Sequence, residues 1–237
     1  MKRSLPITTI FLDIGGVLLT DGWDHHARRR AAKSFKLKWA EMEERHRLMF
    51  DAHEEGKVTL AEHLNLVVFY RERPFTRAQF RHFMFAQSKP YPRMIELIAR
   101  LKVQHGLKVV VVGNEARELN AYRIREFKLQ ECVDFFVSSC FVHIRKPDAD
   151  IFRLALDIAQ VAAREVLYID NTPLFVQIAE GLQIQSILHT DHRSTRTKLA
   201  SFGLHDEQRP PPQHALRRLP RRAAAAPSSL FSIRQGA

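Results

Sequence analysis

The chain has 237 residues, of which 45% are hydrophobic and 27% are charged, and this is the composition of a globular protein. Its two cysteines, Cys132 and Cys140, are too few for a disulfide scaffold or a cysteine-rich zinc site, and they favour a cytoplasmic location. No apolar run approaches the roughly 18 residues of a membrane helix, so we expect no membrane partner. The 37 lysines and arginines exceed the 26 acidic residues, which gives a net charge of +11.

The positive charge is unevenly distributed along the chain. Residues 205–237 hold six arginines against two acidic residues, together with five of the 11 prolines, and this composition predicts a disordered tail. The tail carries a net charge of +4 and the rest of the chain +7. No RNA- or DNA-binding motif accompanies the charge, so the sequence favours a mildly basic surface over a nucleic-acid partner.

The first part of the chain changes from a strand pattern to a helical one. Residues 7–12 are apolar and β-branched and predict a short buried strand that ends at Asp13. From residue 21 to 88, charged and apolar residues recur at three- and four-residue spacing, which predicts an all-helical block. Within it, Thr59 and Glu62 match a capping box, and Thr76 opens a further helix after Pro74.

After residue 89, predicted helices and strands alternate. The helices cover 93–104, 115–127, 148–160 and 174–181, and the strands cover 107–112, 135–138, 166–169 and 184–188. This alternation predicts an α/β fold with a Rossmann-like parallel sheet and helices on both faces. We therefore expect a discontinuous core of residues 1–20 and 89–204, an inserted helical cap of residues 21–88, and the tail.

Polar residues follow several of the predicted strands. The first strand leads into Asp13 and the pair Gly15-Gly16, the next into Gly113-Asn114, and the strand at 166–169 into Asp170-Asn171, while Lys146 precedes Pro147. In open parallel sheets, ligands bind at the carboxyl ends of the strands. These residues are therefore expected to converge on one pocket.

In their order and spacing, these segments resemble the haloacid dehalogenase superfamily of hydrolases. The similar stretches are residues 11–18, 110–114, 145–152 and 168–171, and the helical insert is similar to the small helical cap of that superfamily. The resemblance covers residues 5–200, with the tail outside it. The turn at Asp13 and the segment after Lys146 are specific as a pair, and neither would be specific alone.

The resemblance implies Mg²⁺-dependent hydrolysis of a small phosphomonoester, such as a sugar phosphate, through an aspartyl phosphate. Asp13 would be the nucleophile and Lys146 would neutralise charge and hold the phosphate. Asn114 would orient the substrate or the nucleophile. The implied phosphate-binding residues are Gly15, Gly16, Gly113, Asn114 and Lys146, and the implied metal ligands are Asp13, the Gly15 carbonyl, Asp170 and Asn171.

Three positions depart from the pattern that the resemblance implies. Gly15 stands where many phosphatases of the superfamily carry a second Asp as general acid, Gly113 replaces a Ser or Thr, and Asn171 replaces a common acidic metal ligand. Two alternatives follow on the same fold. One is a binding or regulatory protein with degraded catalysis, and the other is a dehalogenase that attacks carbon, whose halide leaving group needs no proton.

A few further features of the sequence bear on the site and on the class of protein. The segment Trp23 to His26 lines the pocket mouth in one interpretation, and in the other it starts a helix with Asp24 as N-cap. Cys140 is expected to be a small buried residue. A phosphoacceptor switch also places Asp and Lys at strand ends, but the large insert after Asp13 argues against it. The sequence does not indicate an oligomeric state.

Overall fold

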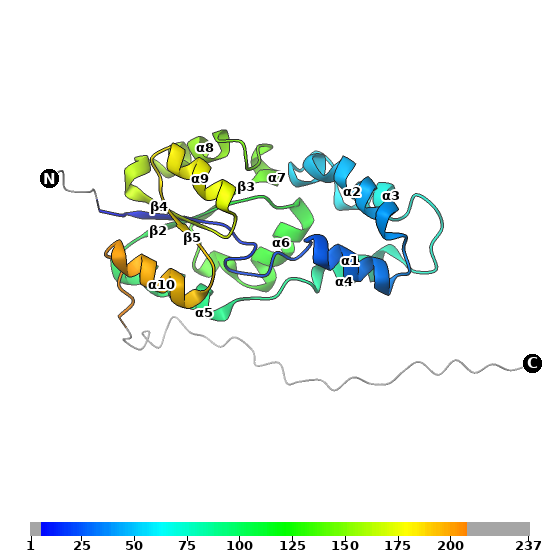
Figure 1. Ribbon diagram of the computed structural model, residues 1–237, viewed down its shortest axis with the longest axis horizontal. Coiled ribbons are helices and arrows are strands. Elements are labelled where there is room, and N and C mark those ends of the chain that lie inside the picture. Colours follow the sequence, from blue (N-terminus) through cyan, green and yellow to red (C-terminus); the bar gives the residue numbers. More distant parts are fainter. Residues whose placement is uncertain (1–5, 208–237) are drawn as a thin grey trace, which may run out of the picture. The chain divides into compact units, whose positions relative to one another are not determined.

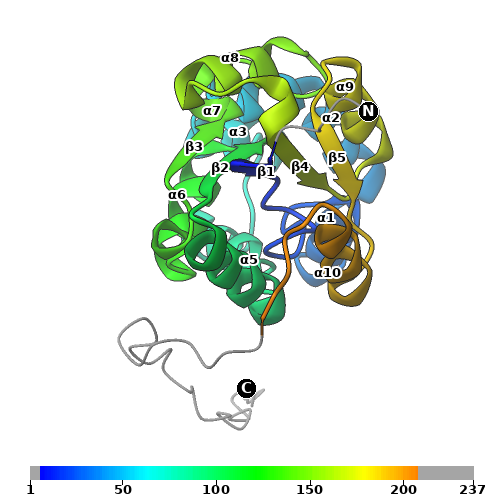
Figure 2. The same cartoon turned by 90° about the vertical axis from the view of Figure 1, so that its left-hand side faces the viewer.

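The computed structural model describes residues 6–207, so most of the predicted tail lies outside the described residues. Five parallel strands form one sheet in the order β3-β2-β1-β4-β5 (Figure 2). The strands are β1 (Thr9–Leu12), β2 (Lys108–Gly113), β3 (Phe135–Ser138), β4 (Val166–Asp170) and β5 (Gln185–Leu188). The parallel sheet confirms the predicted fold class, and each strand lies within three residues of its predicted bounds.

Helices cover both faces of the sheet, as the alternating pattern predicts. They are α5 (Pro92–His105), α6 (Arg117–Glu126), α7 (Ser139–Val142), α8 (Asp150–Ala159), α9 (Pro173–Gly181) and α10 (His192–Ser201), with short 3₁₀ turns at Leu129–Glu131 and Ala163–Glu165. Neither α7 nor α10 follows from the sequence. In α10 only Thr195 and Leu199 are buried, so its apolar periodicity is too weak to predict a helix.

Alternation along the strands assigns their side chains to two hydrophobic layers. Ile10 and Leu12 of β1 pack in the layer that includes α5 and α10, and Phe11 packs in the layer that includes α8 and α9. Figure 2 shows α5 and α10 on one side of the sheet and α8 and α9 on the other. β1 is the central strand, so the residue that follows it lies at the middle of the carboxyl edge.

The predicted helical block, which we call the cap, lies at the opposite end from the start of β1 in Figure 1. It comprises α1 (His25–Ser34), α2 (Trp39–Glu54), α3 (Leu60–Val67) and α4 (Arg77–Phe85). The capping box of Thr59 and Glu62 is confirmed, and Thr76 begins α4 as predicted. The cap has its own aromatic core, in which Phe80 meets Trp23 edge-on with 5.7 Å between ring centroids.

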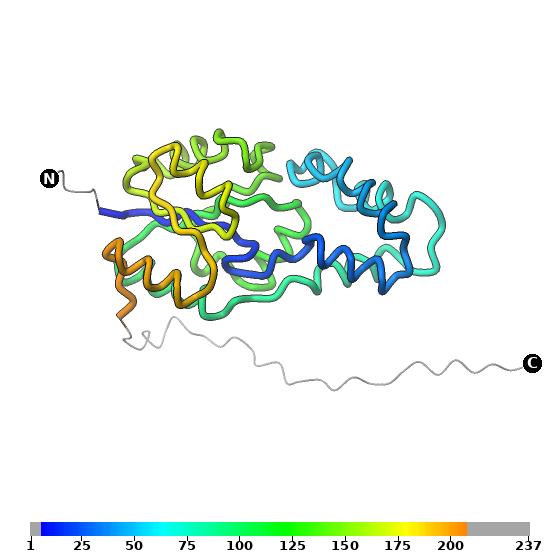
Figure 3. The backbone as a smooth tube through the Cα atoms, in the orientation of Figure 1, coloured from blue at the N-terminus to red at the C-terminus, as the bar shows by residue number. Residues whose placement is uncertain are grey.

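Two linkers join cap and core and run side by side (Figure 3). The amide of Thr20 donates to the Lys89 carbonyl at 2.8 Å, and the amide of Tyr91 donates to the Leu18 carbonyl at 2.8 Å. The Thr20 hydroxyl donates to the Gln87 carbonyl at 2.9 Å. The chain crosses between cap and core along these linkers, and the division at 20/21 and 88/89 stays a prediction.

The packed part of the chain continues beyond the expected start of the tail at residue 205. Asp206 is 3% exposed and pairs with Arg100 at 2.8 Å and with Arg196 at 3.2 Å. These ion pairs attach the segment to α5 and α10. Core and cap together form one compact unit that extends to Asp206.

Candidate active site

Asp13 lies directly beyond β1, at the carboxyl edge of the sheet. Its amide donates to the Ile169 carbonyl of β4 at 3.1 Å, and the chain then turns so that the Leu18 and Leu19 amides donate to the Ile14 carbonyl. Gly16 allows this turn because its φ is +70°, a value that side chains disfavour. The Asp13 side chain is 14% exposed, so its carboxylate reaches the surface of the edge.

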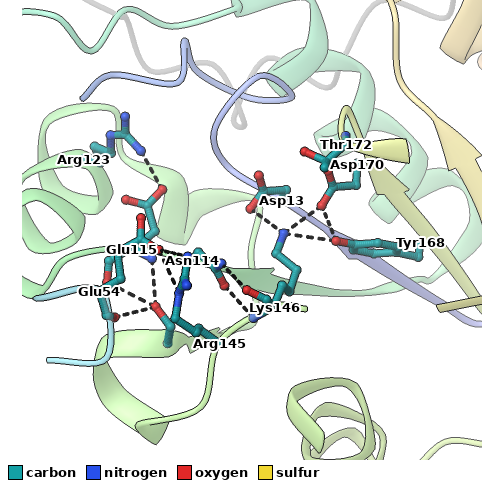
Figure 4. Close-up of polar contacts among 11 residues, drawn as sticks. Asp13, Glu54, Asn114, Glu115, Arg123, Arg145, Lys146, Tyr168, Asp170 and Thr172 are labelled. Atoms are coloured by element: carbon teal, nitrogen blue, oxygen red, sulfur yellow. Dashed lines mark hydrogen bonds and ion pairs between the residues drawn. The ribbon is translucent and has the colours of Figure 1, made fainter. Parts of the chain in front are cut away.

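Lys146 lies between two carboxylates at this edge (Figure 4). Its ammonium group is 3.2 Å from Asp13 Oδ1 and 2.7 Å from Asp170 Oδ2. The Lys146 side chain is 1% exposed and Asp170 is fully buried. A buried cation between two anions is stable only if it is paired and hydrogen-bonded, and here both conditions hold.

Tyr168 completes the environment of Lys146. Its hydroxyl accepts from Lys146 Nζ at 3.1 Å and donates to Asp170 Oδ2. The other Asp170 oxygen accepts from the Thr172 amide at 2.7 Å. Both oxygens of Asp170 are therefore engaged by protein donors, which fixes the direction in which Lys146 points.

The electrostatic balance of the site follows from burial and these pairs. Burial raises the pKa of Asp13 to about 7, against the opposing effect of the Lys146 charge. Burial alone would lower the pKa of Lys146, but Asp13 and Asp170 raise it above the ordinary value. Burial and the neighbouring Asp170 raise the pKa of Tyr168 well above 10. Lys146 is therefore the positive charge of the site, and Tyr168 acts as a neutral hydrogen-bonding group.

Asn114 bonds to Lys146 through both polar atoms of its side chain. Its Nδ2 donates to the Lys146 carbonyl at 2.8 Å, and its Oδ1 accepts from the Lys146 amide at 2.8 Å. We expected Asn114 to orient the substrate or the nucleophile. Its contacts instead favour a positioning role, in which the end of β2 holds the backbone from which the lysine extends.

The three glycines predicted at the site leave room for particular side chains. A Cβ atom at Gly113 would lie 2.8 Å from Asp13 Oδ1, and one at Gly16 would lie 2.0 Å from Asn171 Nδ2. A Cβ at Gly15 would lie 3.4 Å from Asp21 Oδ1. Gly113 therefore makes space for the Asp13 carboxylate, and Gly16 for the amide of Asn171.

Asp21 is a carboxylate near the site that the sequence reasoning missed. It lies beside Gly15 and Asn171, where the first linker enters the cap. Partial burial and Asp24 raise its pKa, while Asn171 and Arg123 lower it. The neighbouring Asp24 caps α1 by accepting from the Ala27 amide at 2.7 Å, which confirms the interpretation of this segment as a helix start.

The cap docks on the core beside Lys146. Arg145 donates to Glu54 of α2 at 2.8 Å and also pairs with Asp51. The Ser139 hydroxyl donates to the Glu54 carbonyl at 2.6 Å and accepts from the Glu115 amide at 2.9 Å. Burial raises the pKa of Glu54 to about 7, against the effect of Arg145. The end of α2 thus contacts residues next to both Asn114 and Lys146.

A buried ion pair holds the two linkers. Arg123 and Glu115 pair with 2% and 3% of their side chains exposed. Arg123 also donates to the Asp21 carbonyl at 2.7 Å and to the Ser88 hydroxyl at 3.0 Å. A Cβ at Gly22 would lie 1.7 Å from Arg123 Nη2, so glycine is required there. This group, which we call the linker clamp, joins α6 to both linkers.

The donors at the edge fit a small, hard cation. Asp13 Oδ2 makes no hydrogen bond within residues 6–207, and the Gly15 carbonyl and the Asn171 amide oxygen are also of the type that Mg²⁺ prefers. No group of three or more acidic, histidine or cysteine side chains within 6–207 is arranged to hold a metal. A magnesium ion would thus rely on few carboxylates and on water, which is usual for this ion.

Asp170 and Cys140 are two further predicted residues that the structure places. Asp170 lies at the edge as expected, but its two oxygens already serve Lys146, Tyr168 and Thr172, which makes it a positioning group rather than a free ligand. Cys140 is buried as expected. The sequence offered a signal for Tyr168, because residues two apart in a strand share a face, but none for the linker clamp.

Comparisons with known proteins agree with this geometry. A haloacid dehalogenase-like hydrolase family model matches residues 7–174, so the chain belongs to this family of hydrolases. No curated protein matches the sequence. Within residues 6–207, no helix is both long and apolar enough to cross a membrane.

Several solved structures share the fold at low sequence identity. The HAD family enzyme bt-2542 from Bacteroides thetaiotaomicron is 18% identical, with a TM-score of 0.69 over 84% of this chain and 99% of that one. It was also solved with magnesium and inorganic phosphate. A predicted HAD-like hydrolase from Porphyromonas gingivalis is 19% identical, with a TM-score of 0.68 over 86% of this chain and 100% of that one.

A dehalogenase is also similar in fold. The L-2-haloacid dehalogenase from Xanthobacter autotrophicus, solved with chloropropionic acid covalently bound, is 15% identical to this chain. The similarity has a TM-score of 0.55 over 82% of this chain and 83% of that one. Fold similarity alone therefore includes a dehalogenase as well as an enzyme that was solved with phosphate.

Proposed function

We propose that this hydrolase cleaves small phosphomonoesters with Mg²⁺, through a phosphoryl group carried on Asp13. The observation that carries the proposal is the buried ammonium group of Lys146, 3.2 Å from Asp13 Oδ1 and held by Asp170 and Tyr168. A fixed positive charge beside a carboxylate nucleophile is what an anionic substrate requires, since it reduces the repulsion between them.

The reaction takes two steps. In the first, an Asp13 oxygen forms a bond to phosphorus, the bond to the ester oxygen breaks, and the leaving alcohol gains a proton. In the second, water attacks phosphorus, which releases inorganic phosphate and restores the carboxylate. Lys146 stays protonated throughout and balances the negative charge. Asp13, the Gly15 carbonyl and Asn171 would hold Mg²⁺, which when bound neutralises charge on the phosphoryl oxygens.

Asp21 is proposed to serve the leaving-group side of the substrate. Gly15 lacks the second carboxylate of related phosphatases, but Asp21 Oδ1 lies 3.4 Å from where a Cβ at position 15 would be. A carboxyl on the first linker therefore reaches the space that the glycine leaves open. Replacement of Asp21 by Asn is expected to reduce kcat on a poor leaving group more than on an aryl phosphate.

A direct experiment compares the protein with its Asp13→Asn variant on an aryl phosphate, with and without Mg²⁺. We expect the variant to lose activity by a factor on the order of 10³ or more, because it removes the nucleophile. Asp157→Asn, the same change at an exposed position on α8, is the matched control and should retain full activity. Equal turnover by the protein and the Asp13 variant would refute the mechanism.

Asn171 provides a second test, which addresses the alternative of a degraded catalyst. An Asn171→Asp variant adds a charged ligand for a hard cation, so we expect the half-saturating Mg²⁺ concentration to fall about tenfold, or about 1.4 kcal/mol. Gly113→Ser should not restore activity, since its Cβ would lie 2.8 Å from Asp13 Oδ1. Binding of inorganic phosphate without turnover in any variant would favour the regulatory alternative.

The dehalogenase alternative is favoured by one feature, the absence of a carboxylate at Gly15, because a halide leaves without a proton. The same preparations can be assayed for chloride release from 2-chloropropionate. We expect no chloride above the level given by Asp13→Asn. Chloride release together with inactivity on aryl phosphate would replace the phosphatase proposal by this one.

A further inference from the structure

A cavity lies on the cap, and none of the residues proposed for phosphoryl transfer lines it. Its volume is about 520 Å³, within the usual range for small-molecule sites. The residues that line it come from α1 and from the chain leading into α2: His26, Arg29, Arg30, Ala32, Lys33, Leu37 and Trp39. We call this cavity the α1 pocket.

The charged side of the α1 pocket comes from one face of a helix. His26, Arg29, Arg30 and Lys33 are spaced three or four residues apart in α1, so their side chains lie along one face of the helix. No acidic residue is among the pocket's lining residues. Within residues 6–207, Arg29, Arg30 and Lys33 make no ion pair, whereas Arg28 on the same helix pairs with Glu43 at 2.6 Å.

Two of these cations are oriented by neighbouring groups. Arg30 donates through Nε and Nη2 to Gln87 Oε1, at 3.1 Å and 2.9 Å, which leaves its Nη1 group free of protein partners within the described residues. The Arg29 guanidinium lies over the Trp39 ring, 5.7 Å from the ring centroid. Arginines held in place lose less side-chain entropy when they bind an anion.

The rest of the lining, which we call the apolar wall, consists of Leu37, Trp39 and Ala32. A cavity lined by an indole and by cations that form no ion pair within residues 6–207 matches an anion that also carries a flat apolar group. Multiply charged phosphates suit several cations at once, and arginine binds their oxygens through paired donors.

We propose that the α1 pocket binds an organic oligophosphate, of the chemical class of a nucleoside triphosphate. The phosphates would contact Arg29, Arg30 and Lys33, and the flat group would pack toward Trp39. This site uses none of the residues proposed for catalysis, so the proposal can be tested independently of the phosphatase activity.

The test is a titration of the full chain with ATP in EDTA, in which binding is measured by calorimetry and by tryptophan fluorescence. An Arg29→Gln/Lys33→Gln variant removes two pocket charges, and Arg47→Gln/Arg81→Gln removes two charges from exposed positions of α2 and α4 outside the pocket. We expect the pocket variant to weaken ATP binding by a factor on the order of 10 or more, and the control to change it less than about threefold. All four positions are exposed, so both variants should fold.

Tripolyphosphate separates the two halves of the proposed ligand. It should bind more weakly than ATP and quench less fluorescence, since it cannot reach the apolar wall. Equal affinity for the two anions would overturn the assignment of the flat group to Trp39. Equal weakening by the pocket and control variants, or unchanged binding in the pocket variant, would overturn the site itself, because the binding would then come from the general positive charge of the chain.

Discussion

The sheet edge and the cap both bury ionisable side chains, but they stabilise them differently. At the edge, Lys146 is charged and shares its charge with Asp13 and Asp170. In the cap, His46, His53 and His63 are buried and form no ion pair with another residue of 6–207. Buried charge therefore serves the site at the edge, whereas the cap keeps its buried rings neutral.

The cap histidines form a compact cluster. His53 and His63 stack with 4.0 Å between ring centroids, and His46 Nδ1 lies 3.4 Å from His63 Nε2. Each ring retains one nitrogen that has no hydrogen-bond partner within residues 6–207. Burial lowers the pKa of His46 to about 3, of His53 to about 4 and of His63 to about 2. Arg28 reinforces this effect at two of the rings, while Glu118 opposes it at His53.

The largest effect should come from removing the central cation of the edge. Lys146→Met leaves Asp13 and Asp170 buried side by side, so we expect a loss of activity by a factor on the order of 10³ and a loss of about 3–5 kcal/mol in the free energy of unfolding. Urea denaturation and an aryl phosphate assay measure the two effects. Lys198→Met, which removes a lysine that among the described residues bonds only to the Leu188 carbonyl, is the control. Similar effects of both variants would contradict the role of Lys146.

The linker clamp tests what joins the two regions. Arg123→Met leaves Glu115 buried and unpaired, with an expected loss of about 3–5 kcal/mol. The double variant Arg123→Met/Glu115→Leu should recover part of this loss but not all of it, because the Asp21 carbonyl and the Ser88 hydroxyl still lose their donor. A double-mutant cycle followed by urea denaturation measures the interaction. Additive effects would show that the pair contributes nothing.

Acid should act on the cap through its histidines. Unfolded histidines take up protons below about pH 6.5 but the folded ones only near pH 4 and lower, so this stabilisation is complete above pH 6.5 and is lost as the pH falls. Each ring should contribute a loss of about 2 kcal/mol by pH 5. His63→Phe should remove one such contribution, measured as unfolding free energy against pH. His82→Gln, at an exposed cap position, should leave the pH dependence unchanged.

The effect of Glu54 on the pH dependence of stability is opposite to that of the histidines, so the two effects must be measured separately. Its pKa is raised from 4.5 to about 7, so between these pH values Glu54 carries a proton in the folded protein but not in the unfolded chain. Protonation of Glu54 therefore stabilises the fold as the pH falls through this range. A Glu54→Gln variant should therefore steepen the loss of stability in acid.

For the histidines, a pH profile that is the same for His63→Phe and the unmodified protein would contradict the assignment to the cap cluster.

The smallest predicted effect concerns the entrance to the cap. Asp24→Ala removes the side chain that accepts from the Ala27 amide at the start of α1. We expect a loss of about 1 kcal/mol in the free energy of unfolding, and Asp24→Asn should retain most of the stability. Thermal unfolding followed by circular dichroism measures both. A larger loss in the Asn variant than in the Ala variant would indicate that the charge of Asp24 matters more than its cap.

Local sequence patterns were sufficient to predict the sheet and most of the cap. Apolar β-branched runs located the strands, and Asp13 and Asp170, the polar residues after two of them, were expected at one edge because parallel strands share that edge. Lys146 was added to this group from its place before Pro147. The hydrogen-bond partners of these residues at the sheet edge were harder to predict from the sequence. An amide such as Asn114 can bond backbone or substrate equally well, and only the folded chain shows that it bonds to Lys146.

Contacts between core and cap could not be predicted from local patterns. Asp21 approaches Gly15, and Arg123 reaches the linkers, only because the cap folds back toward the core along a path that no periodicity specifies. The α1 pocket depends in the same way on how the chain between α1 and α2 turns. Tyr168 differs because it lies within the core, and its spacing of two residues from Asp170 was visible in the sequence.

The central place of β1 in the sheet has a consequence for how the protein is made. Both neighbours of β1, namely β2 and β4, are synthesised after the entire cap; Lys146 lies between these two strands in the chain, and Asp170 is the last residue of β4. The emerging chain therefore carries Asp13 on an unpaired strand until β2, which ends at Gly113, has been translated. The site can be completed only after Asp170 of β4 has been added, so truncation before β4 should leave an aggregation-prone fragment rather than a weak enzyme.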